Sequence, residues 1–126
     1  MKTIWIVDDD EDMIHAVQLM LKLLNYNTRL FYSARLAAQT LLNNERPDLF
    51  VLDINMPEVS GIDFLEFLRR RSALVDIPVV MLSTEAADVL VDKAMDLGAD
   101  AYVTKPVAIE ELELAIKKAF QAHNLN

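Results

Sequence analysis

Ile4-Trp5-Ile6-Val7-Asp8-Asp9-Asp10-Glu11-Asp12 is a short apolar run that ends abruptly in five consecutive acids. A continuous apolar run, rather than an alternating one, is typical of a strand that is covered on both faces of a parallel sheet. Runs of the same kind recur at Leu49–Leu52, Val79–Leu82 and Ala101–Val103. Thr28–Tyr32 is more mixed in polarity and predicts an edge strand.

The segments between these runs have the apolar spacing of helices. The periodic positions are Ile14/Val17/Leu21/Leu24, Ala34/Ala37/Leu41, Phe64/Leu65/Leu68, Leu90/Ala94/Leu97 and Leu112/Ile116/Phe120. Ser33 is placed to cap the second helix, and Gly98 lies where a left-handed residue ends the fourth. Strands that alternate with helices in this way predict an α/β, doubly wound sandwich around a parallel sheet.

Composition limits what this chain can be. Its 126 residues are enough for one domain, which we expect to span 1–126. A formal net charge of −8 disfavours binding to nucleic acid or anionic lipid. No apolar run approaches the roughly 18 residues of a membrane span. Met1–Val7 lacks the layout of a signal peptide, and the sequence has no cysteine, so we expect a cytoplasmic protein.

Polar residues follow four of the predicted strands at their carboxyl ends, where ligands bind in sheets of this type. They are Asp8-Asp9-Asp10, Asp53-Ile54-Asn55-Met56-Pro57, Ser83-Thr84-Glu85 and Thr104-Lys105-Pro106. If the first and third strands are adjacent, Asp8, Asp9 and Asp53 converge. Carboxylates about 4 Å apart repel by roughly 4 kcal/mol at an effective dielectric near 20, so the cluster needs a cation. Oxygen ligands without histidine or cysteine favour Mg²⁺, or the similar Mn²⁺.

These groups predict a phosphoryl-transfer chemistry. An ionised carboxylate beside a divalent cation and a lysine can attack phosphorus to form an aspartyl phosphate. The cation and Lys105 would neutralise charge on the phosphoryl oxygens, and Ser83 offers a hydroxyl donor. The product carries close to −2 where the carboxylate carried −1, which is a local electrostatic switch.

At this level of detail the sequence resembles the receiver domains of two-component response regulators, over essentially the whole chain. The motifs that carry the resemblance are Ile6-Val7-Asp8-Asp9-Asp10, Leu52-Asp53-Ile54-Asn55-Met56-Pro57 with Gly61, Met81-Leu82-Ser83-Thr84-Glu85-Ala86, and Gly98-Ala99 with Tyr102-Val103-Thr104-Lys105-Pro106. The resemblance implies a flavodoxin-like (βα)5 fold with strand order 2-1-3-4-5.

The resemblance also assigns the phosphorylation site. It implies that Asp53 is the phosphoacceptor, and that Asp8, Asp9, Asp53 and the backbone carbonyl of Asn55 hold the metal. Lys105 would contact the phosphoryl group, with a cis bond to Pro106.

Further roles are implied for residues around that site. Ser83 would be the switch hydroxyl and Tyr102 the switch aromatic, while Asn55 and Glu85 would tune dephosphorylation. Two residues depart from the common pattern: Val107 stands where Phe is frequent, and Ser83 where Thr is frequent.

The implied partner is a sensor histidine kinase or a phosphotransfer protein. The resemblance makes the chain a phosphoacceptor that assists its own phosphorylation and dephosphorylation, not a classical enzyme. The face formed by the Leu90–Leu97 helix, the Ala101–Val103 strand and the Leu112–Phe120 helix would engage a second copy or an output domain.

Other interpretations of the same residues remain open. The acidic run could cap a helix, Asp53 could form a turn, and Tyr102 could be a half-buried packing residue. A phosphatase of the haloacid dehalogenase type also uses an aspartate nucleophile with Mg²⁺, but it needs a second acid where this chain has Asn55. A pseudo-receiver that binds a partner without phosphorylation is a further alternative.

Three basic segments carry no predicted function. His15 and His123 are expected to have no partner. Arg69-Arg70-Arg71 is expected to complement the negative end of a helix dipole.

Overall fold

The computed structural model describes residues 1–124, in which five strands alternate with five helices. The strands are β1 (Thr3–Val7), β2 (Asn27–Phe31), β3 (Leu49–Asp53), β4 (Val79–Ser83) and β5 (Ala101–Thr104). The helices are α1 (Glu11–Leu23), α2 (Ala34–Leu42), α3 (Gly61–Arg69), α4 (Asp88–Asp96) and α5 (Ile109–Ala122). The predicted element order is confirmed, and the bounds shift by one or two residues.

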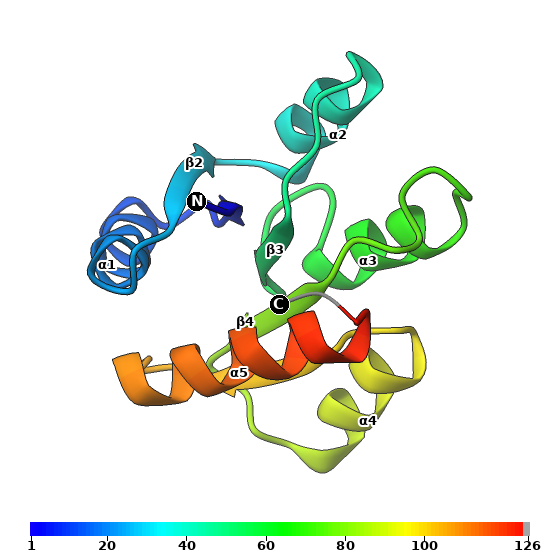
Figure 1. Cartoon of the computed structure of the whole chain (residues 1–126). Helices are drawn as coiled ribbons and strands as arrows, with labels where there is room; N and C mark the ends of the chain where they lie inside the picture. The colour runs from blue at the N-terminus through cyan, green and yellow to red at the C-terminus, as the bar shows by residue number, and fades with distance from the viewer. Residues whose placement is uncertain (125–126) are drawn as a thin grey trace.

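The five strands form one parallel sheet in the order β2-β1-β3-β4-β5, so the predicted fold class is confirmed. Helices α1 and α5 cover one face, and α2, α3 and α4 cover the other (Figure 1). The mixed β2 segment lies at an edge, as its polarity predicts. Within residues 1–124, no helix is both long and apolar enough to cross a bilayer.

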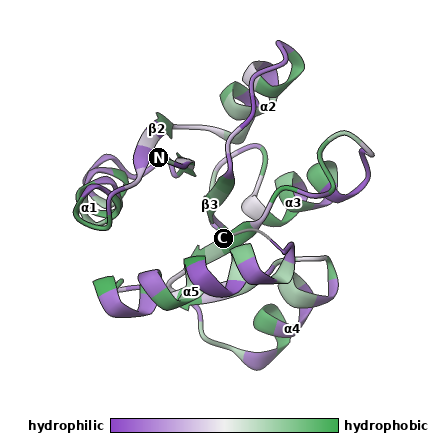
Figure 2. Ribbon diagram, viewed as in Figure 1, coloured by the Kyte–Doolittle hydropathy of each residue, from purple (hydrophilic) through white to green (hydrophobic). Residues whose placement is uncertain are grey.

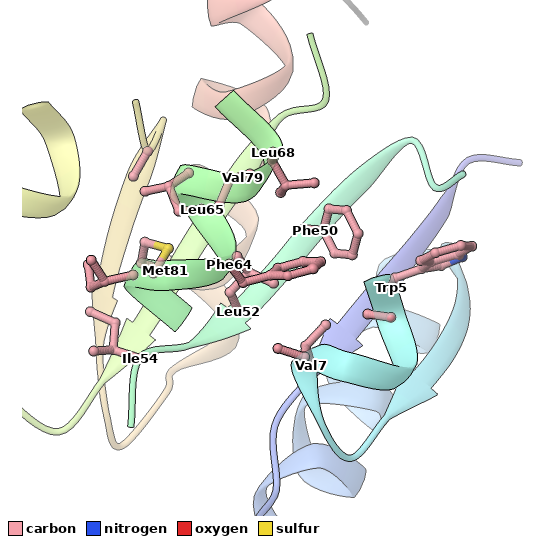
Figure 3. Packing of buried hydrophobic residues seen from close by; sticks show 14 of the residues in the cluster. Trp5, Val7, Phe50, Leu52, Ile54, Phe64, Leu65, Leu68, Val79 and Met81 are labelled. Atoms are coloured by element: carbon pink, nitrogen blue, oxygen red, sulfur yellow. The ribbon is translucent and has the colours of Figure 1, made fainter. Parts of the chain in front are cut away.

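The strands are apolar because helices cover both faces of the sheet, so that side chains on either face are buried. Every residue of β3 and of β4 is buried. On the α2–α3–α4 side, Phe50 packs edge-on against Trp5 and Phe64, with ring centroids 5.7 and 5.3 Å apart (Figure 3). Edge-to-face contacts add stabilisation beyond the area that the rings bury. These contacts join β1, β3 and α3 on this face of the sheet.

Side-chain caps mark the starts of α1, α2 and α3. Asp10, Ser33 and Ser60 each accept a hydrogen bond from a backbone N–H of the first turn, which caps α1, α2 and α3. Gly98 has a φ of 108°, so the predicted left-handed position after α4 is confirmed. By contrast, α4 begins after Ala87 with no side-chain cap.

A half-buried ion cluster lies at the end of the sheet opposite the strand carboxyl ends. The Arg69 guanidinium donates to Asp100 Oδ2 at 3.2 Å and to the backbone carbonyls of Val75, Ile77 and Gly98. His123 Nε2 lies 3.0 Å from both oxygens of Asp100. The expectation that His123 has no partner is therefore wrong, and a helix-dipole role does not account for Arg69.

The other histidine also has a partner. His15 Nδ1 lies 2.8 Å from the carbonyl oxygen of Glu11, one turn earlier in α1. The expectation that it stands alone is wrong as well, because a histidine ring can bond to its own helix backbone.

Candidate functional site

Three strand ends meet in one acidic pocket. Asp8 follows β1, Asp53 ends β3, and Lys105 follows β5. The Lys105 ammonium donates to Asp53 Oδ1 at 3.1 Å and to Asp8 Oδ2 at 3.3 Å. Asp8, Asp9 and Asp53 each offer a carboxylate oxygen, and these oxygens lie within 4.8 Å of one another. The convergence that the strand order predicts is present.

The residues of the acidic run have two roles: Asp8 and Asp9 lie at the pocket, and Asp10 caps α1. Asp8 is fully buried, and its Oδ1 accepts a hydrogen bond from the Asp10 backbone N–H at 2.9 Å. Asp9 is exposed at the rim of the pocket. Asp10 turns away and caps α1 by accepting from Met13 N at 3.1 Å. Capping thus accounts for Asp10, but it does not account for Asp8.

Burial controls the charge state of Asp53. Its side chain is 5% exposed, and desolvation, followed by the nearby Asp8 charge, raises its pKa to about 6. Lys105 and the Asn55 backbone act in the opposite direction. Burial by itself would lower the pKa of Lys105, but the carboxylates of Asp8 and Asp53 outweigh that effect and raise it. Lys105 is therefore a fixed positive charge in the pocket.

The loop after β3 is packed directly against Asp53. Gly61 N donates to the Ile54 carbonyl at 2.9 Å, and Ile54 N donates to the Leu82 carbonyl at 2.9 Å. A Cβ on Gly61 would overlap the carbonyl oxygen of Asp53 and lie 2.9 Å from Ile54 Cα. Gly61 is part of the sequence motif that contains Asp53, and the fold shows the physical reason, which is its close backbone approach to Asp53.

We expect Gly61→Ala to destabilise the protein by about 1–3 kcal/mol, because the added methyl forces the β3–α3 loop away from the Asp53 backbone. The change in unfolding free energy is measured by urea denaturation. Wild-type stability in this variant would contradict the close packing described for Gly61.

Ser83 and Tyr102 share one partner in the loop that leads to α4. Ser83 Oγ accepts from the Glu85 backbone N–H at 3.0 Å, and the Tyr102 hydroxyl donates to the Glu85 carbonyl at 2.7 Å. Ser83 is buried and Tyr102 half-buried. Tyr102 is therefore more than a packing residue, because its hydroxyl also bonds the main chain of Glu85. Sequence patterns did not identify the main chain of Glu85 as the link between the two residues.

The donor set suits a hard divalent cation. The pocket offers carboxylate oxygens from Asp8, Asp9 and Asp53, and the chain contains no cysteine. Such oxygen-rich sites suit Mg²⁺ or Mn²⁺ better than soft metals. Asn55 is exposed beside the pocket, and Glu85 is exposed in the β4–α4 loop.

Comparison with known proteins places this arrangement in a family. Residues 4–117 match the family model of the response regulator receiver domain. The chain is 33% identical over 116 residues to the phosphate regulon transcriptional regulatory protein PhoB of Pseudomonas aeruginosa, covering 92% of this chain and 50% of that protein. It is 35% identical over 123 residues to the transcriptional regulatory protein BasR of Escherichia coli, covering 96% of this chain and 53% of that protein. The chain thus spans about half the length of these relatives.

Comparison with solved structures gives the same result as comparison of sequences. The chemotaxis protein CheY4 of Vibrio cholerae superposes with a TM-score of 0.84 at 25% identity, covering 94% of this chain and 98% of that one. A CheY-like response regulator receiver domain protein from Methanospirillum hungatei gives a TM-score of 0.84 at 26% identity, covering 98% of this chain and 97% of that one. Fold, pocket and sequence match together show that the chain belongs to the response regulator receiver domains of two-component systems.

Proposed function

We propose that residues 1–126 form one receiver domain that accepts a phosphoryl group on Asp53 from a histidine kinase or phosphotransfer protein, in a Mg²⁺-dependent reaction in the cytoplasm. The observation that carries the proposal is the buried Asp53 carboxylate, held by Lys105 and grouped with Asp8 and Asp9. The arrangement provides a nucleophile, a fixed cation and a set of metal ligands in one pocket.

The cation would be held by Asp8, Asp9, Asp53 and the backbone carbonyl of Asn55. When bound, Mg²⁺ would supply positive charge against the phosphoryl oxygens, which is most of what phosphoryl transfer requires of a site. Lys105, whose pKa is raised, supplies a second positive charge from the protein itself.

The transfer step follows from these positions. A carboxylate oxygen of Asp53 forms a bond to phosphorus as the phosphorus–nitrogen bond of the phosphohistidine breaks, and the leaving nitrogen keeps the electron pair. Lys105 orients the carboxylate through its contact with Oδ1 and offsets the repulsion from Asp8. Both effects favour a nucleophile held in place for an in-line displacement.

The switch would begin at Ser83. Its Oγ accepts from the Glu85 N–H in the structure. If the Ser83 side chain turned so that its hydroxyl donated to a phosphoryl oxygen, Oγ would leave the Glu85 N–H, and the Tyr102 bond to the Glu85 carbonyl would be the other contact that holds this loop. A shift from 1:99 to 99:1 between two states requires about 5.5 kcal/mol, and new bonds from Ser83 and Lys105 to the dianion contribute to it. The exposed side chains of Asn55 and Glu85 would tune dephosphorylation.

The face that reports the change would be α4, β5 and α5, because Ser83 leads to α4 and Tyr102 lies in β5. A second copy or an output domain would engage it. The curated relatives are about twice as long as this chain, and two of them are named as transcriptional regulatory proteins.

Incubation with acetyl phosphate and Mg²⁺ tests the proposed function. Intact mass spectrometry should detect a single phosphoryl adduct on the wild type and none on Asp53→Asn. An Asp53→Asn protein that gains the adduct as fast as the wild type would show that the acceptor is another residue.

Stability without metal should fall as the pH rises from about 4 to about 6. Asp53 has a folded pKa of about 6 and an ordinary value of 3.8, so the folded state binds the extra proton across this range. The difference corresponds to about 3 kcal/mol, lost as Asp53 ionises and absent above the folded pKa. Urea unfolding at several pH values in EDTA measures it. Asp53→Asn should flatten this part of the profile, and an equally steep profile in that variant would contradict the assignment.

Magnesium should raise thermal stability at pH 7. A cation relieves the repulsion among Asp8, Asp9 and Asp53, and a ligand at 100 times its dissociation constant stabilises the folded state by about 2.7 kcal/mol. Thermal melts in a Mg²⁺ series, with Asp8→Asn/Asp9→Asn as control, measure the shift. An equal shift in the control would place the cation elsewhere.

A further inference from the structure

A surface groove lies between α3 and α4, outside the phosphorylation pocket. It has a volume of about 470 Å³ and is lined by Glu66 of α3, by Val89, Asp92, Lys93 and Asp96 of α4, and by Leu97 after it. The α4 residues are spaced as one helical face. Val89 at one end is an apolar side chain that is 80% exposed, next to the charged residues of the same helical face.

The groove has an acidic edge formed by Asp92 and Asp96, with Lys93 between them and Asp88 one turn before, outside the groove lining. Asp88, Asp92 and Asp96 follow one another at four-residue spacing along α4, and all three are exposed. None of the ion pairs among residues 1–124 involves them. Like charges at this spacing repel along a helix. Figure 2 shows hydrophilic and hydrophobic residues side by side on α4.

Helix α4 is also weakly tied to the domain. It begins without a side-chain cap, and of its residues only Ala94 is fully buried. An apolar contact together with cations placed against the aspartates would therefore stabilise α4 from outside.

We infer that this α3–α4 groove docks a basic amphipathic helix of a partner protein. An apolar side chain of that helix contacts Val89 and Leu97, and its lysines or arginines lie against Asp92 and Asp96. Helices dock in grooves in this way through anchors on one face. A second copy docked groove to groove would place Asp92 and Asp96 against the same acids, so charge complementarity favours a different, basic partner. It excludes nucleic acid.

The groove shares α4 with the α4–β5–α5 face, but its other wall is α3, and no residue of β5 or α5 is among those that line it. Binding to it does not require phosphorylation. Any effect of phosphorylation on docking rests on the proposed function, through the short loop that joins Ser83 to Asp88. The groove can therefore be tested in the unphosphorylated protein, so its failure and that of the Asp53 assignment are separate results.

Two synthetic helical peptides of identical composition test the inference: one segregates lysine and leucine onto opposite faces, and the other is scrambled. Titration into ¹⁵N-labelled protein gives dissociation constants and maps the contacts. We expect the amphipathic peptide to bind about tenfold tighter than the scrambled one and to shift the signals of Glu66, Val89 and Asp96. Binding should weaken as salt screens the charges.

Matched variants locate the binding. Asp92→Lys/Asp96→Lys should weaken it by about tenfold or more, whereas Glu110→Lys/Glu111→Lys, an equal charge change on exposed positions of α5, should change it by less than about twofold. Equal binding of both peptides, equal effects of the two variants, or signals that move on α5 in the wild type would overturn the inference. Dimerisation through this groove on concentration would overturn it too.

Discussion

Replacing Lys105 with methionine should slow phosphorylation of Asp53 by acetyl phosphate about 100- to 1000-fold, the usual cost of removing one donor aimed at a developing charge. Lys105 is 12% exposed and lies 3.1 Å from Asp53 Oδ1 and 3.3 Å from Asp8 Oδ2. Methionine keeps the length and apolar character of the stem but removes the only side-chain cation that contacts the two carboxylates among the described residues. The pKa of Asp53 should rise further, because Lys105 lowers it.

The rate is measured as the time course of the mass adduct at saturating Mg²⁺, and circular dichroism confirms that the variant is folded. Lys118→Met is the matched control, since Lys118 is exposed on α5 away from the pocket. A Lys105→Met rate within threefold of the wild type would remove Lys105 from the reaction.

Replacing Arg69 with methionine should lower the unfolding free energy by about 3 kcal/mol, because it removes the guanidinium from the half-buried Asp100 carboxylate and leaves only His123 and the Val79 N–H as its partners. The two side chains are 13% and 12% exposed. The same guanidinium bonds the carbonyls of Gly98, Val75 and Ile77, so three backbone acceptors lose their donor as well. Since small domains are stable by only about 5–15 kcal/mol, this is a large fraction of the total.

Equilibrium urea unfolding measures the Arg69 effect. Arg46→Met is the matched control: Arg46 pairs with Asp76 at 3.0 Å, but these side chains are 47% and 69% exposed, so the change should cost about 1 kcal/mol or less. If the Arg69 and Arg46 variants lose equal stability, the half-buried cluster of Arg69, Asp100 and His123 does not stabilise the fold more than an exposed ion pair does.

The element order of the fold can be predicted from the sequence because the apolar patterns of strands and helices are local and repeat along the chain. Each buried strand is a short apolar run, and each helix has an apolar stripe, so element order and the covered parallel sheet follow directly. Ser33 and Gly98 mark a helix start and a helix end by their own chemistry. The strand order came from the family resemblance, because spacing alone does not determine which parallel strands are adjacent.

The topology of a parallel sheet predicts which residues meet in the candidate site. It does not predict the individual contacts that distant segments make around them. Carboxyl ends of parallel strands meet at one edge, so Asp8, Asp53 and Lys105 were expected together and lie together. The shared Glu85 main chain and the Arg69–Asp100–His123 cluster depend on contacts between distant segments. A sequence pattern cannot show which buried acid a distant arginine or histidine will reach.

If Asp53 is the single phosphoacceptor, chemical identification of the modified residue should find it at that position. After phosphorylation with acetyl phosphate and Mg²⁺, borohydride reduction converts an aspartyl phosphate to homoserine, which peptide mass spectrometry assigns to one position. We expect homoserine at position 53 alone, with none when Mg²⁺ is replaced by EDTA. Homoserine at Asp8 or Asp9, or a stable phosphate on Ser83 or a histidine, would contradict it.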